Sequence, residues 1–509
     1  MSTSTDPPER PDVLFGGRIP LGDRTLRQHT ARGTVINGTF IVGLSVLSFL
    51  RTFIVAGFLT PKDYGVFGLL VAIIATIAFL RDIGIGDKYI QQSEEDDQAA
   101  FNKAFTLSVL VDAVFFVLLA AIVPVVAHLI DHPELVAPGL VLLLAIPAAT
   151  LTTPLWIFYR RMEFRKQRTL QAADPVVGFV VTVGLAVAGA GYWALIAGAL
   201  AGMWATVAIT LVASPYRLRW NFDRAALREY FSFSWPLFLV NANRLVLVQS
   251  AVFVGQLVLG LGAVGVLTLA NQIGQISNKA DTIVTGTIYP AICAVQERTE
   301  LLFETFVKSN RLGLMWGMPF GIGLALFASD LVHFVLGSRW DTAIPLLQVF
   351  GLIVALGHLG YNWDAFLRAR SDTRPIAIVG IASTVAYLGV AIPLLVVDGI
   401  EGYAIGAAAQ MATALVVRSY YLTKLFDGFQ MLKHAARAIA PSIPATAVVL
   451  LPRLFESGSR TFATAVAELA AYAVVTIGAT AYLERDLIRE IVGYLRTVQP
   501  GRAVPAGSS

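Results

Sequence analysis

The stretch that decides the fold is residues 235–290, which read WPLFLVNANRLVLVQSAVFVGQLVLGLGAVGVLTLANQIGQISNKADTIVTGTIYP. Two long apolar runs cover it, Phe233–Leu259 and Val264–Ile292, and each is long enough to cross the roughly 30 Å hydrocarbon core of a bilayer as a helix. Both runs carry charged and amide side chains. A Lys or Arg near mid-membrane costs about 2.5–3.5 kcal/mol on insertion scales, so such side chains must face water or partners. The stretch therefore predicts two membrane helices that line a polar cavity.

The polar side chains of the second run fall within one narrow face at about 100° per residue. Lys279 and Asp281 flank this face, and an ion pair between them is the structural alternative to a role in a cavity. In the first run, the polar side chains other than Asn243 share a broader face. The second face comprises Asn271, Gln275, Asn278, Thr282, Thr285 and Tyr289, and the first comprises Asn241, Arg244, Gln249 and Gln256.

The composition excludes a soluble protein. Of 509 residues, 56% are apolar and 14% are charged, whereas a soluble domain carries about 25% charged residues. Fourteen runs are long and apolar enough to be membrane helices; twelve is the alternative count, because Pro175–Gly189 and Ala438–Phe455 are short or interrupted by proline. The lone Cys293 excludes an intramolecular disulfide and a cysteine-based metal site.

The distribution of Lys and Arg predicts the orientation. If the amino terminus is cytoplasmic, 29 of the 38 Lys and Arg residues fall in inner segments, and only Lys62, Arg339, Arg453 and Arg460 fall in outer loops. This asymmetry predicts an even number of helices and two cytoplasmic termini. The net charge of +4 follows from this topology and does not indicate nucleic-acid binding. Short outer loops and the absence of P-loop, HExxH and nucleophile-elbow motifs favour a carrier over an ATPase or a transferase.

The first predicted helix, Thr34–Leu59, also gathers polar side chains on one face. Arg51 lies about two turns from its outer end, so snorkelling to the outer surface is the alternative to a role in the cavity. Arg81 lies near the inner end of the second predicted helix, where it could pair with Asp82 or face the inner interface. The first helix presents Thr34, Asn37, Ser45, Ser48, Arg51 and Thr52 on this face.

Carboxylates inside membrane helices are candidate sites for a coupling proton or sodium ion. They are Asp82, Asp112, Asp281 and Asp364, and nothing in the sequence separates them. Asp112 lies about seven residues from the inner end of its helix, so it could instead reach water. His358, in the tenth predicted helix, is interpreted as a hydrogen-bonded structural residue in preference to a ligand. We predict no metal site and no cofactor other than a coupling H⁺ or Na⁺.

An internal repeat appears when the chain is displaced by 200 residues. Six predicted helices separate the two copies, which predicts two lobes related by an axis along the membrane normal, as in parallel-repeat transporters. In register, Leu59, Gly65, Val66, Leu69 and Ile73 match Leu259, Gly265, Val266, Leu269 and Ile273. We therefore predict an all-α integral membrane protein with a cytoplasmic tail (1–33), an N-lobe of six helices (34–213), an amphipathic linker (214–232), a C-lobe of six helices (233–426), and two further helices with a cytoplasmic tail (427–509).

Several segments resemble the polysaccharide flippases of the multidrug/oligosaccharidyl-lipid/polysaccharide (MOP) exporter superfamily, whose fold is MATE-like. The resemblance extends from about Arg32 to Phe429, and it departs from the family pattern at residues 260–265, which lack the Pro-Lys-Asp-Tyr sequence of the first copy. The matching segments are Phe53–Gly68, Asp82–Gly86, Gln91–Gln92, Phe158–Phe164, Asn221–Asp223, Leu259–Ala291 and Ala365–Pro375.

The resemblance implies a flippase, not an enzyme, that moves a polyprenyl-diphosphate-linked oligosaccharide from the inner to the outer leaflet of the bacterial cytoplasmic membrane by alternating access, for the export of a cell-surface polysaccharide such as an exopolysaccharide. Membrane lipids and a polysaccharide polymerase or export machinery would be its partners. Arg51, Arg244 and Lys279 would face the diphosphate and Arg81 the inner mouth, and the two terminal helices would form a groove for the lipid tail. A MATE-type antiporter for drugs or organic cations is the alternative; a membrane glycan polymerase is a more distant one.

Overall fold

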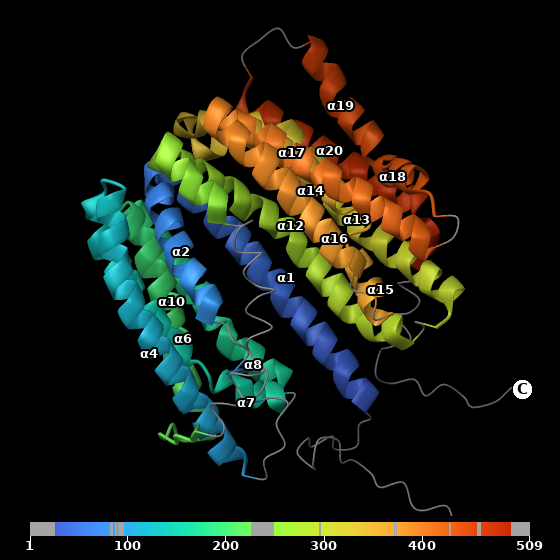
Figure 1. Cartoon of the computed structure of the whole chain (residues 1–509). Coiled ribbons are helices and arrows are strands. Elements are labelled where there is room, and N and C mark those ends of the chain that lie inside the picture. Colours follow the sequence, from blue (N-terminus) through green and yellow to red (C-terminus); the bar gives the residue numbers. More distant parts are fainter. Residues whose placement is uncertain are drawn as a thin grey trace, which may run out of the picture. The chain divides into compact units, whose positions relative to one another are not determined.

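The computed structural model describes residues 26–81, 85–86, 89, 96–161, 163–224, 249–294, 297–370, 372, 374–426, 429–455 and 460–489. Within these ranges it describes the backbone alone at 26–39, 41–42, 75–81, 164, 276, 278–280, 282–284, 286–287, 289–291 and 293–294. Every regular element of these ranges is a helix (Figure 1). The chain divides into two compact units between Ile273 and Gly274, and each unit is described by itself.

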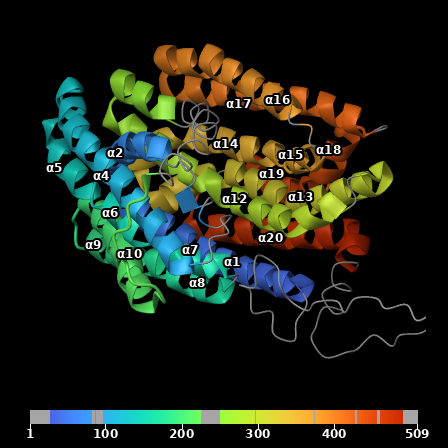
Figure 2. The ribbon, with the colours of Figure 1, turned by 60° about the horizontal axis from the view of Figure 1, so that its bottom comes forward.

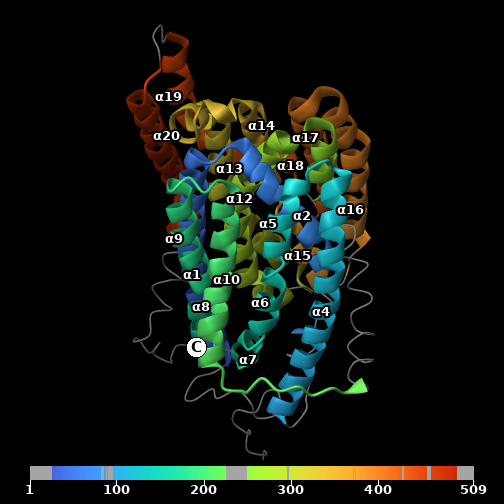
Figure 3. The same cartoon turned by 90° about the vertical axis from the view of Figure 1, so that its left-hand side faces the viewer.

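The first unit is built from long helices and one broken span. The fourth predicted span, Leu135–Tyr159, is interrupted. Pro138, Pro147 and Pro154 each lack the backbone N–H that an α-helix needs at that position. Helices α9 and α10 pack side by side (Figure 3). The elements are α1 (Leu26–Phe58), α2 (Pro61–Arg81), α4 (Asp97–Leu129), η1 (Pro133–Leu135), α5 (Val136–Leu142), α6 (Ala145–Leu151), α7 (Leu155–Arg160), α8 (Phe164–Gln171), α9 (Ala173–Val187), α10 (Tyr192–Ala213) and the start of α12 (Leu261–Ala294).

The fifth span is longer than the sequence predicts. The apolar run alone begins at Pro175, but α8 and α9 together provide an apolar span of 23 residues, Arg165–Val187. The two helices meet at Ala172, so Asp174 in the first turn of α9 lies well inside the span. The first of the two weak predicted spans is therefore long enough to cross the membrane.

The two copies of the predicted repeat begin their helices at matching positions. Helix α2 begins at Pro61 and α12 begins at Leu261, which is the same offset that relates the matched residues of the sequence. The side chain of Thr268 packs beside Gly68, so the matched turns of these two helices also touch.

The second unit contains the rest of α12 and the helices that follow it. Its core includes a cluster of aromatic rings in which Phe306, Phe366 and Phe426 are fully buried. Helices α13 and α14 pack together, as do α16 and α17 (Figure 2). The elements are α13 (Thr299–Leu331), η2 (Val332–Leu336), η3 (Ser338–Ala343), α14 (Ile344–Gly357), α15 (Trp363–Ala369), α16 (Arg374–Ala386), η4 (Tyr387–Ala391), α17 (Ile392–Leu425), α18 (Met431–Ile439), α19 (Ser442–Phe455) and α20 (Phe462–Leu483).

The number of membrane spans can be compared with the prediction only in the described ranges. There, eight helices are long and apolar enough to cross a membrane, and a ninth is added if α18 and α19, which meet at 52°, form one span. One of the eight, Arg374–Leu425, covers the predicted span Pro375–Val397 and all but the last residue of the predicted span Gly402–Phe426, with a break at Gly399. Gly43–Phe58 and Gln249–Leu259 are shorter apolar helices. The fourteen-helix count and the predicted lobe boundaries stay predictions.

Candidate functional site

Arg51 lies in the membrane part of the first unit and points toward α9. Its guanidinium Nη1 is 3.6 Å from the place that a Cβ on Gly178 would occupy, and Oδ1 of Asp174 is 3.9 Å from the same place. Arg51 is half-buried, whereas Asp174 is exposed. An exposed carboxylate within a membrane span is costly in hydrocarbon, so we expect this side of α9 to face water. Arg51 of α1 and Asp174 of α9 lie close together beside Gly178.

Asp174 is a residue that reasoning from the sequence missed. The fifth predicted span begins at Pro175, which places Asp174 in the inner loop. The signal that could have found it is the short length of that span, because a span extended back to Arg165 contains Asp174. In the fold, its carboxylate packs against Gly202 of α10, where a Cβ would overlap it.

The polar stripe of α12 is partly described. Asn271 and Gln275 are exposed, and Thr285 is half-buried. Gln249 is half-buried, and Gln256 is buried in the first unit with 7% of its surface exposed. That Asn271 and Gln275 line a cavity stays a prediction.

The second unit pairs Asp281 of α12 with His358, which follows α14. His358 Nε2 is 3.0 Å from Asp281 Oδ2 and 3.2 Å from the hydroxyl of Ser277. The other ring nitrogen, Nδ1, is 2.6 Å from the carbonyl oxygen of Val354. His358 is 1% exposed and Asp281 is 15% exposed, so both groups are largely removed from solvent. The partner of Asp281 is thus a histidine from a distant part of the chain.

A break in the tenth predicted helix positions His358. The predicted helix is continuous, but α14 ends at Gly357 and α15 begins at Trp363. The backbone carbonyls freed by the break find donors: Arg418 Nη1 donates to Gly357 at 3.1 Å and to Leu359 at 2.9 Å. Asn310 Nδ2 donates to the His358 carbonyl at 3.0 Å. Irregular backbone at membrane depth needs such donors, because lipid supplies none.

The remaining described coupling candidates have different surroundings. Asp112 of α4 is 4% exposed and accepts a hydrogen bond from the Thr150 hydroxyl, so it does not reach water. Asp364 of α15 pairs with Arg368 one turn later at 3.0 Å, where both side chains are partly exposed.

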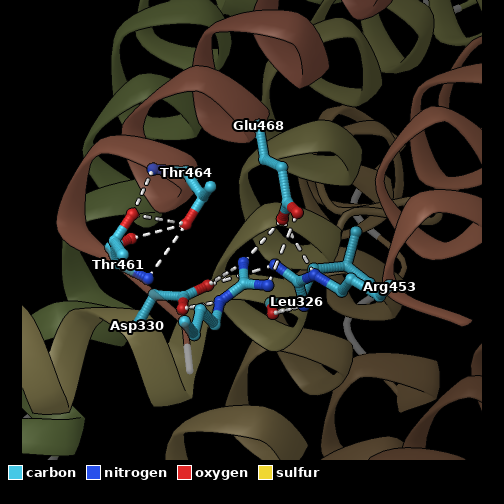
Figure 4. A network of polar contacts seen from close by, with 7 residues as sticks. Leu326, Asp330, Arg453, Thr461, Thr464 and Glu468 are labelled. Carbon is cyan, nitrogen blue, oxygen red and sulfur yellow. Dashed lines mark hydrogen bonds and ion pairs between the residues drawn. The ribbon is translucent and has the colours of Figure 1, made fainter. Parts of the chain in front are cut away.

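Four charged side chains join the terminal helices to α13 at one end of the second unit (Figure 4). Arg453 donates to Asp330 at 3.1 Å and to Glu468 at 2.9 Å, and Arg460 donates to the same two carboxylates. Arg453 also donates to the carbonyl of Leu326 at 2.8 Å. Glu468 of α20 therefore belongs to a compensated cluster that holds α19 and α20 against α13.

A second cluster joins the opposite end of α20 to α13 and α18. Glu484, which follows α20, is ion-paired with Arg311 of α13 and lies 3.6 Å from Arg437 of α18. Glu484 is 7% exposed. Arg311, Arg437 and Glu484 also line a small pocket that His434 of α18 enters. Helix α20 is thus attached to α13 near both of its ends.

Several predicted site residues cannot be placed. Asp82, Asn241 and Arg244 lie outside the described residues. The side chains of Asn37, Arg81, Asn278, Lys279 and Thr282 also lie outside the described part of the chain. Ser48 is described, and its hydroxyl donates to the Leu44 carbonyl one turn earlier at 2.9 Å. Within the described residues, no group of three or more His, Cys, Asp or Glu side chains is placed to hold a metal ion.

Comparison with known proteins identifies relatives over most of the chain. A family model described as polysaccharide biosynthesis protein matches residues 54–345. The succinoglycan biosynthesis transport protein ExoT of Rhizobium meliloti (strain 1021) is 24% identical over 500 residues, which cover 92% of this chain and 97% of ExoT. The lipopolysaccharide biosynthesis protein WzxC of Escherichia coli (strain K12) is 23% identical over 394 residues, which cover 75% of this chain and 77% of WzxC.

Solved structures share the fold. The lipid II flippase MurJ in an inward closed conformation matches with a TM-score of 0.69 and 12% identity, over 88% of this chain and 99% of MurJ. An inward-facing multidrug resistance MATE transporter of the MOP superfamily matches with a TM-score of 0.60 and 14% identity, over 76% of this chain and 98% of the transporter. The predicted all-α, MATE-like membrane fold is confirmed.

Proposed function

Because the chain belongs to the polysaccharide biosynthesis protein family, we propose that it is a flippase for a polyprenyl-diphosphate-linked oligosaccharide. It moves this lipid from the inner to the outer leaflet of the bacterial cytoplasmic membrane by alternating access. Two similar proteins support this substrate class: ExoT is a succinoglycan biosynthesis transport protein, and MurJ, which shares the fold, is a lipid II flippase. We also propose that both termini are cytoplasmic and that a polysaccharide polymerase or export machinery uses the product.

The observation that carries this proposal is the position of Arg51. The Arg51 guanidinium lies two turns inside a membrane helix and beside the exposed Asp174, so we infer that it contacts water at membrane depth. A diphosphate that crosses hydrocarbon needs cations that can donate several hydrogen bonds at once, and a guanidinium does this in a fixed geometry. We propose Arg51, Arg81, Arg244 and Lys279 as the cations that meet the diphosphate along its path.

The test is a flipping assay in proteoliposomes with undecaprenyl diphosphate that carries one fluorescently labelled hexose. The Arg51→Ala variant is compared with wild type, and Lys62→Ala is the matched control because Lys62 is an exposed cation at the start of the neighbouring α2. We expect Arg51→Ala to reduce flipping by about tenfold or more, since one charge-assisted hydrogen bond contributes about 1.5–3 kcal/mol. The Lys62→Ala rate should equal that of wild type.

Two results would contradict the proposal at different points. If wild type does not move the labelled lipid faster than empty vesicles do, the chain is not a flippase for this class of lipid. If wild type flips it and folded Arg51→Ala flips it equally fast, Arg51 does not meet the diphosphate, and the cationic path must be drawn without it.

One observation favours a second candidate, an antiporter for organic cations. Asp174 is an exposed carboxylate within a membrane span, which is the charge that a cationic substrate would pair with. Uptake of a labelled quaternary ammonium ion into the same vesicles separates the two functions. An antiporter moves this ion and requires Asp174, whereas the proposed flippase leaves it outside.

A further inference from the structure

The hydrogen bonds of His358 determine where its protons are. Val354 offers His358 Nδ1 a carbonyl oxygen, which can only accept, so Nδ1 carries a proton and donates it. A neutral imidazole has one N–H, and therefore Nε2 of neutral His358 presents a lone pair. That lone pair would face the Asp281 carboxylate oxygen at 3.0 Å. Two acceptors at that distance repel each other, so the contact requires one more proton between them.

The pair therefore holds a proton in this conformation, either on His358 Nε2 or on Asp281 Oδ2. Ser277 does not remove this requirement, because its single hydroxyl proton can satisfy only one of the two facing acceptors. Asp281 Oδ1 is buried and has no hydrogen-bond partner among the described residues. A fully charged Asp281 would thus leave one buried oxygen uncompensated, which adds to the cost of losing the proton.

The surroundings fix the imidazole, and among the described titratable groups Tyr361 interacts electrostatically with Asp281. Gly317 of α13 makes room for the ring, since a Cβ there would overlap it. The ring of Tyr361 lies 6.2 Å away, and its hydroxyl is directed to the Ser309 carbonyl. Arg418 of α17 is held by the carbonyls of the helix break. His434 of α18 contacts Asn310 and not the pair. Asp364 is paired with Arg368. The side chain of Lys279 lies outside the described residues.

We propose that Asp281 and His358 form the proton-binding site that couples flipping to a proton gradient. The proposal rests on the proposed flippase function and names the residues of its coupling step. With the proton bound, the pair joins α12 to the broken segment between α14 and α15. When the proton passes to water, the lone pairs of His358 Nε2 and Asp281 Oδ2 repel each other. The Ser277 hydroxyl can donate to only one of these two acceptors, so the other must move away to reach water. Proton loss therefore separates α12 from that segment.

The test uses Asp281→Asn, which replaces the carboxylate by an amide of the same shape. The amide N–H donates to His358 Nε2 in place of the bound proton, so the variant keeps this conformation but cannot load or release a proton. His358→Gln is the second variant, because Gln cannot hold a titrating proton. The matched control is Asp341→Asn, which removes the carboxylate of another Asp–His pair in the same unit: His333 and Asp341 lie 3.5 Å apart, and both are about half exposed.

The first measurement is accumulation of the fluorescent undecaprenyl-diphosphate hexose across a gradient of one pH unit. Such a gradient is worth a factor of about ten for each coupled proton. For exchange of one proton against one lipid, wild type and Asp341→Asn should accumulate the lipid up to about tenfold in the leaflet that faces the acidic side. Asp281→Asn and His358→Gln should accumulate none, even if they equilibrate the lipid without a gradient.

The second measurement needs no substrate. Infrared difference spectra between acidic and alkaline samples of the full-length protein in detergent report the protonation of buried carboxyl and imidazole groups. Wild type and Asp341→Asn should show one titrating signal that Asp281→Asn lacks. Gel filtration and thermal unfolding of each variant establish that it is folded, and His358→Gln provides the transport result if Asp281→Asn is not.

The outcomes distinguish this proposal from the function on which it rests. If Asp281→Asn and His358→Gln accumulate lipid as wild type does, the pair is not the coupling site. If wild type flips the lipid but a pH gradient produces no accumulation, proton coupling is wrong while the flippase function stands. If wild type does not flip the lipid, the proposed function fails, and the infrared signal alone decides whether Asp281 and His358 bind a proton.

Discussion

Gly65 of α2 and Gly265 of α12 make the same contact with each other's helix. Gly65 packs against the carbonyl of Leu261, the first residue of α12, and Gly265 packs against the carbonyl of Pro61, the first residue of α2. A Cβ on either glycine would overlap the opposing backbone. The contact is reciprocal. Gly65 and Gly265 are 200 residues apart in sequence, as are Pro61 and Leu261, so a local two-fold axis passes between the starts of the two helices.

We expect Gly265→Ala to destabilise the protein. The new methyl group meets a backbone carbonyl that cannot rotate away, and overpacking of this kind costs about 1–3 kcal/mol. The control is Gly262→Ala on the same helix, where a Cβ meets nothing within 4 Å. That change should be neutral or slightly stabilising, because Ala favours a helix over Gly by about 1 kcal/mol. Thermal unfolding in detergent measures both, and equal midpoints would show that the two helices can separate without cost.

Removal of one carboxylate from the cluster in Figure 4 should loosen the terminal helices. In Glu468→Gln, Arg453 and Arg460 share only Asp330, and the loss of one partner from a largely buried ion pair costs up to about 3 kcal/mol. The control is Glu304→Gln, which breaks an exposed pair with Lys308 on α13 and should cost less than about 1 kcal/mol. Unfolding in increasing SDS gives both free energies. A Glu468→Gln effect no larger than the control would mean that the cluster is not what holds α20.

The helix break at residues 358–362 depends on Arg418. In Arg418→Met the carbonyls of Gly357 and Leu359 lose their donor, and each unsatisfied buried group costs about 1–3 kcal/mol. The same substitution at the exposed Lys424, in the last turn of α17, should change the free energy of unfolding very little. Arg418→Lys should recover part of the loss, since its ammonium can donate to at least one carbonyl. No recovery would indicate that the lost stability comes from packing of the longer side chain.

Asp174 should weaken the attraction of Arg51 for a diphosphate. Asp174→Asn removes a negative charge near the guanidinium, and an exposed pair is worth up to about 1 kcal/mol, so we expect half-maximal flipping at an up to about fivefold lower lipid concentration. The change should disappear in the Arg51→Ala background, where no cation remains for Asp174 to compensate. An equal change in both backgrounds would show that Asp174 acts on the lipid without Arg51.

The hydropathy of the chain was sufficient to predict an all-α membrane fold, because apolar runs and the Lys and Arg asymmetry report directly on the bilayer. It was not sufficient to predict where helices break. The tenth predicted helix reads as one apolar run through residues 358–362, although Gly357 ends α14 and Gly360, inside the break, has a positive φ of 68°. The fifth span was predicted too short for the opposite reason: the polar start of α8 concealed that the helix continues toward Arg165.

The sequence was sufficient to locate polar side chains in the predicted helices, but not to identify their contact partners. Asp281 was predicted to lie in the membrane, but its neighbour in sequence, Lys279, was the partner considered. Its partner in the fold is His358, and helical spacing carries no signal across so many residues. Arg453 and Arg460 were likewise predicted only to lie in outer loops, whereas in the fold both pair with Asp330 and Glu468.

Helix α12 runs without interruption from Leu261 to Ala294. Asp281 therefore lies on the same helix as Gly265, about 24 Å away along the helix axis at 1.5 Å per residue. When a straight helix tilts about one point, a distant point on the same helix is displaced by a larger distance. A displacement of Asp281 on proton release therefore has a direct route along one unbroken helix to the residue, Gly265, that packs against α2.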